Sequence, residues 1–279
     1  MKRVQSIKQT PIISSNIIKS GWSNIVVEIN DQEIFRFTRH ESNQFEVEKS
    51  FLAQFHGPDS VQVPVPTRVG ADYMTYKRIP GERFSPEKFE TLKPHDQQQI
   101  INQISLFLTH LHSCPFQHVH LAEYPYGGEN FWGELWPIPA LHLSDRAKTM
   151  AKQFFDASFE KINATPFRKR VIHADLGTNN LLVDFSVPRL NGIIDFSDLC
   201  WGDPAADFAG FYRHFGRQFV DQLLVAYEKQ IEWEIETNFW SRIKFHAQRK
   251  QFFVIYFAQK YQFQEFIPQI LESIEADFS

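Results

Sequence analysis

The chain has 279 residues and a formal net charge of −4, with 43% hydrophobic and 15% aromatic residues. Its 28 phenylalanines exclude a disordered chain. The charge argues against a nucleic-acid surface as the main function, because such surfaces need clustered Lys and Arg. Cys114 and Cys200 form no disulfide framework, and the longest apolar run, residues 252–258, is too short to span a bilayer. We expect a cytoplasmic protein without a membrane segment.

The first part of the chain predicts β-structure. Residues 25–29 and 34–37 are β-branched or aromatic runs separated by a polar turn. A second turn, residues 20–24, precedes them. Its backbone N–H groups could bind phosphates, which makes Ser23 and Asn24 candidate nucleotide contacts. An ordinary hairpin has the same pattern.

Residues 46–52 have helical spacing, and residues 73–79 predict another strand. A strand that leaves the sheet at this point would be a hinge whose backbone reads a purine edge. Thr75 and Lys77 are the candidate contacts on it. A plain edge strand gives the same pattern.

The remainder predicts mostly helices. Residues 97–112 are the clearest amphipathic helix, residues 143–162 predict a second, and the chain from residue 218 onward is helical and rich in aromatics. Residues 124–139, with two tryptophans, three glycines and three prolines, predict a long loop. We expect four cations to be solvated counter-charges for nearby acids: Arg242, Lys244, Arg249 and Lys250.

The most specific signal lies at the centre of the chain. His173 and Asp175 follow an apolar strand, Asn180 comes five residues after Asp175, and Asp195 ends the next apolar strand. The spacing H-x-D-x-x-x-x-N matches the catalytic loop of protein kinases. In that chemistry Asp175 would orient a hydroxyl, while Asn180 and Asp195 would hold Mg²⁺. A hairpin whose Asp and Asn residues only form turns would explain no fixed spacing.

A nucleotide-dependent kinase also needs a cation on the donor phosphates and a helical carboxylate to hold that cation. Arg36 is the candidate cation. Glu48 is the candidate carboxylate, with Glu46 as second choice. The alternative for either glutamate is a solvated helix face.

Three further groups have predicted roles. Asp203 would cap a helix that begins at a proline, and Asp207 would brace the catalytic loop through backbone hydrogen bonds. Acidic residues 228–236, with Glu228, Glu232 and Trp233, would bind an amine through charge and cation–π contacts. Asp198 would supply a further carboxylate. The alternative for this patch is a solvated helix face.

Together these motifs resemble the aminoglycoside phosphotransferase family over most of the chain. The resemblance is sharpest in residues 171–180, 192–196 and 203–207. Residues 34–40 are most similar to the aminoglycoside 2″-phosphotransferase branch. Arg36 stands where many relatives have a phosphate-binding Lys, and Arg is not a neutral replacement because it is longer and planar. His173 matches a residue that shapes the catalytic loop.

The resemblance implies an α+β, two-lobed, protein-kinase-like fold. Residues 1–78 would be a nucleotide-binding lobe with an antiparallel sheet and one main helix, and residues 79–279 a mostly helical catalytic and substrate-binding lobe. It implies transfer of the γ-phosphate of ATP or GTP, with Mg²⁺, to a hydroxyl of a cationic small molecule, most simply an aminoglycoside antibiotic. We expect a monomer. The alternatives are a kinase for a macrolide, a choline-like compound or a metabolite sugar, and an inactive nucleotide-binding module that acts through a partner.

Overall fold

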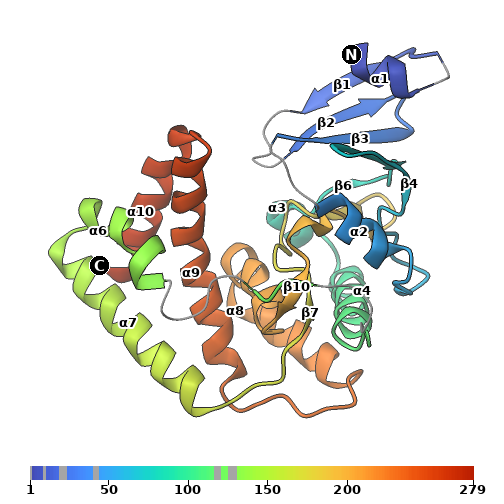
Figure 1. Cartoon of the computed structure of the whole chain (residues 1–279). Helices are drawn as coiled ribbons and strands as arrows, with labels where there is room; N and C mark the ends of the chain where they lie inside the picture. Colours follow the sequence, from blue (N-terminus) through green and yellow to red (C-terminus); the bar gives the residue numbers. More distant parts are fainter. Residues whose placement is uncertain (1, 9–10, 19–23, 40–43, 116–120, 125–130) are drawn as a thin grey trace. The chain divides into compact units, whose positions relative to one another are not determined.

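The computed structural model describes residues 2–8, 11–18, 24–39, 44–115, 121–124 and 131–279 (Figure 1). The chain divides into two compact units. The first combines Met1–Leu121 with Thr178–Leu199, and the second combines Ala122–Gly177 with Cys200–Ser279. The lobe boundary at residue 78 stays a prediction.

A five-stranded antiparallel sheet opens the first unit, in the order β1-β2-β3-β5-β4. Its central strand, β3, buries side chains on both faces because alternate residues point to opposite sides. Phe35 and Phe37 pack on one face with Val27 of β2, whereas Arg36 lies on the other. The elements of this part are α1 (Lys2–Ile7), β1 (Ser15–Ile18), β2 (Asn24–Ile29), β3 (Glu33–Thr38), α2 (Gln44–Leu52), β4 (Pro66–Val69) and β5 (Tyr73–Lys77).

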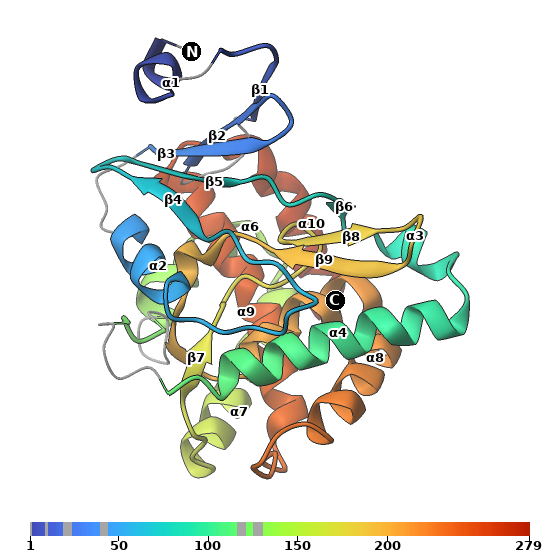
Figure 2. The same cartoon turned by 90° about the vertical axis from the view of Figure 1, so that its right-hand side faces the viewer.

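The rest of the first unit is built on a second, three-stranded sheet in the order β6-β8-β9. The long helix α4 lies along β9 (Figure 2), where Gln103 accepts a hydrogen bond from the backbone N–H of Leu190 at 2.8 Å. Leu181 of β8 pairs with Ile193 of β9. The elements are β6 (Glu82–Arg83), α3 (Pro86–Glu90), α4 (Pro94–His112), β8 (Leu181–Asp184), β9 (Arg189–Ile193) and the 3₁₀ turn η2 (Phe196–Asp198).

The second unit is mostly helical. Strands β7 and β10 form a short antiparallel pair at its centre, in which Val171 is opposite Trp201. Helix α8 is broken at Gly216, whose φ of 75° suits glycine. The elements are η1 (Phe131–Leu135, a π-helical turn), α6 (Pro137–His142), α7 (Asp145–Ala164), β7 (Arg170–Ile172), β10 (Cys200–Gly202), α8 (Ala206–Glu228), α9 (Phe239–Lys260), η3 (Gln264–Phe266) and α10 (Ile267–Phe278).

An aromatic core joins η1, α7, α9 and α10. The Phe131 ring lies 4.2 Å from that of Phe155 and 5.3 Å from that of Phe252, and the Trp136 ring stacks on Phe252 at 5.9 Å. The prediction of a loop over residues 124–139 was therefore wrong from residue 131 onward. Burial of these rings favours helical turns there, and Pro137 fits because it occupies the first helical turn of α6. Residues 125–130 lie outside the described part.

The predicted fold class is confirmed: an antiparallel sheet with one main helix comes first, and a larger, mostly helical part follows. Helix α1 was not predicted from the sequence. Among the described residues, no helix is long and apolar enough to cross a membrane.

Helix α8 packs closely against the segment that carries Asp175. A Cβ atom placed on Gly210 would overlap the carbonyl oxygen of Leu176 and would lie 3.2 Å from Cα of Gly177. Both neighbours are backbone atoms, so they cannot rotate away. The absence of a side chain at Gly210 is what lets the helix approach this segment.

We expect Gly210→Ala to destabilise the protein by about 1–3 kcal/mol, because overpacking against backbone forces a shift. Urea unfolding followed by circular dichroism measures this change. Gly133→Ala is the matched control, since a Cβ at Gly133 meets nothing within 4 Å. Equal stability of the two variants would contradict the close packing.

Candidate active site

A buried arginine joins two carboxylates in the first unit. Nη1 of Arg36 donates to both carboxylate oxygens of Glu48, at 2.7 and 3.0 Å, and Nη2 donates to Oδ1 of Asp195 at 2.8 Å. Arg36 is 2% exposed and Glu48 is fully buried, whereas the Asp195 side chain is 41% exposed. The planar guanidinium thus fixes a partly exposed carboxylate to a buried one.

The charges of this cluster depend on one another. Burial alone would lower the pKa of Arg36, but the carboxylates of Glu48 and Asp195 outweigh burial and raise it. Burial raises the pKa of Glu48, and the charge of Arg36 opposes this. Because a guanidinium stays protonated in proteins and both Glu48 oxygens accept from it, we treat Glu48 as ionised.

Asp195 is held by its backbone as well as by Arg36. It ends the β8–β9 hairpin in a left-handed conformation, with φ of 65°, and Ser197 donates to its Oδ1 at 2.6 Å. The next backbone N–H, of Phe196, donates to Glu48. Glu48 therefore supports both the Arg36 side chain and the chain beside Asp195.

Asn180 lies at the start of the same hairpin. Its carbonyl oxygen accepts a hydrogen bond from the Ile194 N–H at 2.9 Å, so Asn180 and Asp195 belong to facing ends of adjacent strands. Asn180 is 6% exposed. An amide and a carboxylate oxygen suit Mg²⁺, which usually takes few protein ligands and keeps waters and substrate phosphates. The donor set fits this ion, because a carboxylate has enough lone pairs to bind it and still accept from Arg36 and Ser197.

Asp175 belongs to the second unit, on a tightly held turn. The two carboxylate oxygens of Asp207 accept from the backbone N–H groups of His173 and Ala174, at 2.9 and 2.8 Å. Ala174 is left-handed, with φ of 66°, and the Asp175 N–H donates to Nδ1 of His173 at 3.3 Å. His173 and Asp207 are fully buried. These contacts set the backbone that carries Asp175.

The four cations expected to be solvated behave differently from one another. Arg242 and Arg249 are 1% and 2% exposed, and Lys250 forms an ion pair with Asp175, so the prediction was wrong for these three. Lys244 is exposed. Tertiary contacts explain the burial of Arg249: its guanidinium packs over the rings of Tyr124, Phe245 and Phe253, at 4.7 to 5.3 Å from their centroids.

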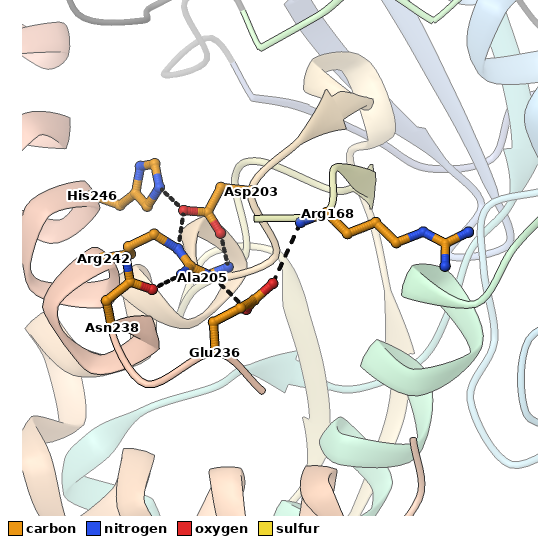
Figure 3. Close-up of polar contacts among 7 residues, drawn as sticks. All are labelled: Arg168, Asp203, Ala205, Glu236, Asn238, Arg242 and His246. Carbon is orange, nitrogen blue, oxygen red and sulfur yellow. Dashed lines mark hydrogen bonds and ion pairs between the residues drawn. The ribbon is translucent and has the colours of Figure 1, made fainter. Parts of the chain in front are cut away.

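Asp203 is the centre of a buried ion-pair network (Figure 3). Its Oδ2 accepts from Nε of Arg242 and from Nε2 of His246, both at 2.9 Å, and its Oδ1 accepts from the Ala205 N–H at 3.0 Å. Arg242 also donates to Glu236 at 2.9 Å. The network ties helix α9 to the turn before α8.

Burial alone would raise the pKa of Asp203, but the hydrogen bond and charge of His246, together with Arg242, lower it. Burial lowers the pKa of His246, despite the opposing effect of Asp203. We infer a neutral imidazole that carries its proton on Nε2, because an ionised carboxylate only accepts hydrogen bonds.

The remaining candidate nucleotide contacts differ in burial. Asn24 is buried at the start of β2 and accepts from Gln44 at 3.3 Å. Thr75 is fully buried in β5, where its hydroxyl lies 2.8 Å from that of Thr67. Lys77 is exposed at the end of β5. Ser23 lies outside the described residues.

The candidate substrate contacts are three exposed acidic residues and the ring of Trp233. Asp198 is exposed on η2 in the first unit. In the second unit Glu228 is exposed at the end of α8, and Glu232 is exposed between α8 and α9. The Trp233 ring already makes a cation–π contact within the protein, since the Arg170 guanidinium lies 3.7 Å from the ring centroid.

Comparison with known proteins shows which family this chain resembles. Residues 16–244 match the model of the phosphotransferase enzyme family. The chain belongs to this family. Viomycin phosphotransferase of Streptomyces vinaceus is 27% identical over 164 residues, which cover 54% of this chain and 53% of the relative. The aligned part thus spans about half the length of that relative.

Two solved structures show the shared fold. The GDP and kanamycin complex of an APH(2″) enzyme has a TM-score of 0.80 at 18% identity, covering 96% of this chain and 94% of its own. Macrolide 2′-phosphotransferase type I has a TM-score of 0.74 at 15% identity, covering 99% of this chain and 95% of its own. The family and the kinase-like fold predicted from the sequence are confirmed.

Sequence reasoning missed two residues near Asp175 in the fold, Lys250 and Gly210. Lys250 follows a buried arginine in an amphipathic helix and has no local motif. Gly210 comes three residues after Asp207 within a helical pattern, where a glycine is unfavourable. That isolated glycine was the one available signal of a close backbone approach.

We expect Arg36→Met to destabilise the protein by about 3–5 kcal/mol, because it leaves Glu48 buried and without its cation. Arg36→Lys should cost less, since the ammonium keeps the charge but cannot donate in a fork to both carboxylates. Urea unfolding measures both. Lys49→Met, on the exposed face of α2, is the control and should change stability by less than about 0.5 kcal/mol. Arg36→Met as stable as wild type would mean that Glu48 is not ionised.

We also expect stability to fall on acidification below about pH 6.5. The pKa of His246 is depressed in the folded state, so the unfolded chain takes up a proton there that the folded chain resists. His214, whose pKa burial also lowers, acts in the same direction. The lowered pKa of Asp203 adds a loss below about pH 4.

Unfolding free energies between pH 5 and pH 7 test this. His246→Gln should flatten the dependence, because glutamine does not titrate. The exposed His95→Gln, which removes a histidine outside the Asp203 network, is the control. An identical slope in wild type and His246→Gln would show that His246 does not titrate with folding.

Proposed function

We propose that this chain transfers the γ-phosphoryl group of ATP or GTP to a hydroxyl of a cationic small molecule, most simply an aminoglycoside. The observation that carries the proposal is the Glu48–Arg36–Asp195 cluster. It places a buried, preorganised cation next to a partly exposed carboxylate at the end of a hairpin that begins with Asn180. Family membership and the spacing of Asp175, Asn180 and Asp195 support the same chemistry.

Each residue has a defined part in this proposal. Asn180 and Asp195 would hold Mg²⁺, which neutralises charge on the donor phosphates. Arg36 would bind the phosphates while Glu48 holds it. Asp175 would orient the acceptor hydroxyl and take its proton as the oxygen–phosphorus bond forms and the bond to the leaving diphosphate breaks. Most of the rate enhancement then comes from positioning and charge neutralisation.

The acceptor class rests on charge. Asp198, Glu228 and Glu232 are exposed carboxylates of the kind that a polycationic substrate needs. The relatives are named for or bound to different compounds: viomycin, kanamycin and a macrolide. A macrolide is therefore the second candidate acceptor, and the high aromatic content would suit it.

A nucleotide-turnover assay with ATP and with GTP tests the proposal. The acceptors are a panel of aminoglycosides, viomycin, macrolides and small metabolite alcohols. We expect an aminoglycoside to stimulate turnover. Asp175→Asn should lower it by roughly 10²- to 10⁴-fold, as expected for loss of a general base, while the nucleotide Kd stays within about threefold.

Asp156→Asn, an exposed carboxylate on α7, is the control and should keep full activity. Stimulation by a macrolide alone would move the acceptor class and keep the reaction. Nucleotide binding with no turnover for any acceptor would favour an inactive nucleotide-binding module. Normal turnover by Asp175→Asn would remove Asp175 from the mechanism.

A further inference from the structure

A lysine from a distant helix lies against the candidate base. Nζ of Lys250, on α9, forms an ion pair with Oδ1 of Asp175, seventy-five residues away in the chain. Both residues belong to the second unit. The Lys250 side chain is 36% exposed and that of Asp175 is 39% exposed. The pair is therefore ordered by the fold and still open to solvent on one side.

The backbone on the Asp175 side is already fixed. Asp207 holds the N–H groups of His173 and Ala174, and His173 accepts from the N–H of Asp175. These contacts fix the backbone at Asp175, and the direction of its carboxylate then depends on its χ angles. A cation at a fixed point restricts them to rotamers that direct a carboxylate oxygen toward it.

The position of Lys250 is equally well determined. One residue earlier, Arg249 is buried against Tyr124; one residue later, Gln251 donates to Asp277 at 2.8 Å. One turn earlier, His246 is bonded to Asp203. Buried contacts thus anchor α9 on both sides of Lys250. The sequence pattern alone predicts a solvated lysine, but the helix is held in a way that directs this one to Asp175.

The charge of Lys250 also affects a histidine of α8, His214. Burial lowers the pKa of His214, and the positive charges of Arg213 and Lys250 lower it further. The His214 ring lies against Gly177, with Cδ2 4.0 Å from the place of a Gly177 Cβ. The Lys250 ammonium is therefore close enough to this part of the fold to affect the charge of His214.

We propose that Lys250 is the positioning residue for Asp175: its ammonium holds the carboxylate in one orientation and supplies the positive charge beside it. The inference rests on the proposed phosphotransfer and adds a residue to it. A base that works near donor phosphates is surrounded by negative charge, and a fixed cation offsets that repulsion. A displacement of about 1 Å in a base costs up to about 10²-fold in rate.

The first test separates positioning from folding and from nucleotide binding. We expect Lys250→Met to lower kcat by about 10- to 100-fold, with the nucleotide KM within about twofold and the far-ultraviolet circular dichroism spectrum unchanged. Lys250→Arg keeps the cation and should recover most of the loss. Lys244→Met is the matched control, because it removes an exposed lysine from the same helix.

Coupling to Asp175 is the decisive point. In the Asp175→Asn background, Lys250→Met should cause little further loss, because residues that act as one unit are not additive. Equal factors in both backgrounds, or wild-type kcat in Lys250→Met, would overturn the proposal.

A second readout does not need turnover. An amine-reactive ester labels neutral lysines, so an ion pair slows it, and peptide mass spectrometry reports each site. We expect Asp175→Asn to speed labelling of Lys250 about two- to fivefold, as expected for a partly exposed ion pair, and to leave Lys244 unchanged. Unchanged Lys250 labelling would overturn the proposal. If wild type phosphorylates no acceptor, the proposed function fails, and labelling alone still decides whether Lys250 holds Asp175.

Discussion

The buried charge of Arg36 is the constraint on which the first unit depends. A guanidinium at 2% exposure is costly to bury unless its charge has partners, and for Arg36 the fold brings one carboxylate from α2 and one from the end of β9. Breaking such a cluster is costly even where forming it contributes little net stability. The sheet, α2 and the β8–β9 hairpin therefore have to keep their relative places within this unit, and Asp195 is positioned as a consequence.

This constraint also explains what an arginine at position 36 can do that a lysine could not. Nη1 is committed to Glu48 and Nη2 to Asp195, so the two carboxylates are served by different nitrogens of one rigid plane. A lysine would concentrate its charge on one flexible atom. In this chain the Arg36 guanidinium binds Glu48, which supports it, and at the same time binds Asp195 at the end of the hairpin.

What the sequence predicted well has a local cause. The strands around Arg36 and the amphipathic helix α4 follow from periodicity along the chain, which does not depend on distant partners. The order of His173, Asp175, Asn180 and Asp195 is a fixed spacing of the same local kind, and the roles assigned to these residues stay a prediction. The loop prediction was wrong over residues 131–139 because aromatic burial against Phe155 and Phe252 decides their conformation, and no local pattern encodes these partners. The prediction of solvated side chains was wrong for Lys250, Arg242 and Arg249 for the same reason. A cation without a local motif is expected to be solvated, and only the fold brings it to a carboxylate or to aromatic rings.

The acidic patch between α8 and α9 illustrates how a partner changes a functional interpretation. The Trp233 ring is covered by Arg170, and Glu236 is bonded to Arg242, so these two residues stabilise the second unit. Glu228 and Glu232 remain exposed. Exposed ion pairs are worth little one at a time and are screened by salt. Recognition of a polycation at such a surface would therefore require several carboxylates at once, and its affinity would fall with ionic strength, whereas an acceptor bound mainly through apolar contact would be far less sensitive.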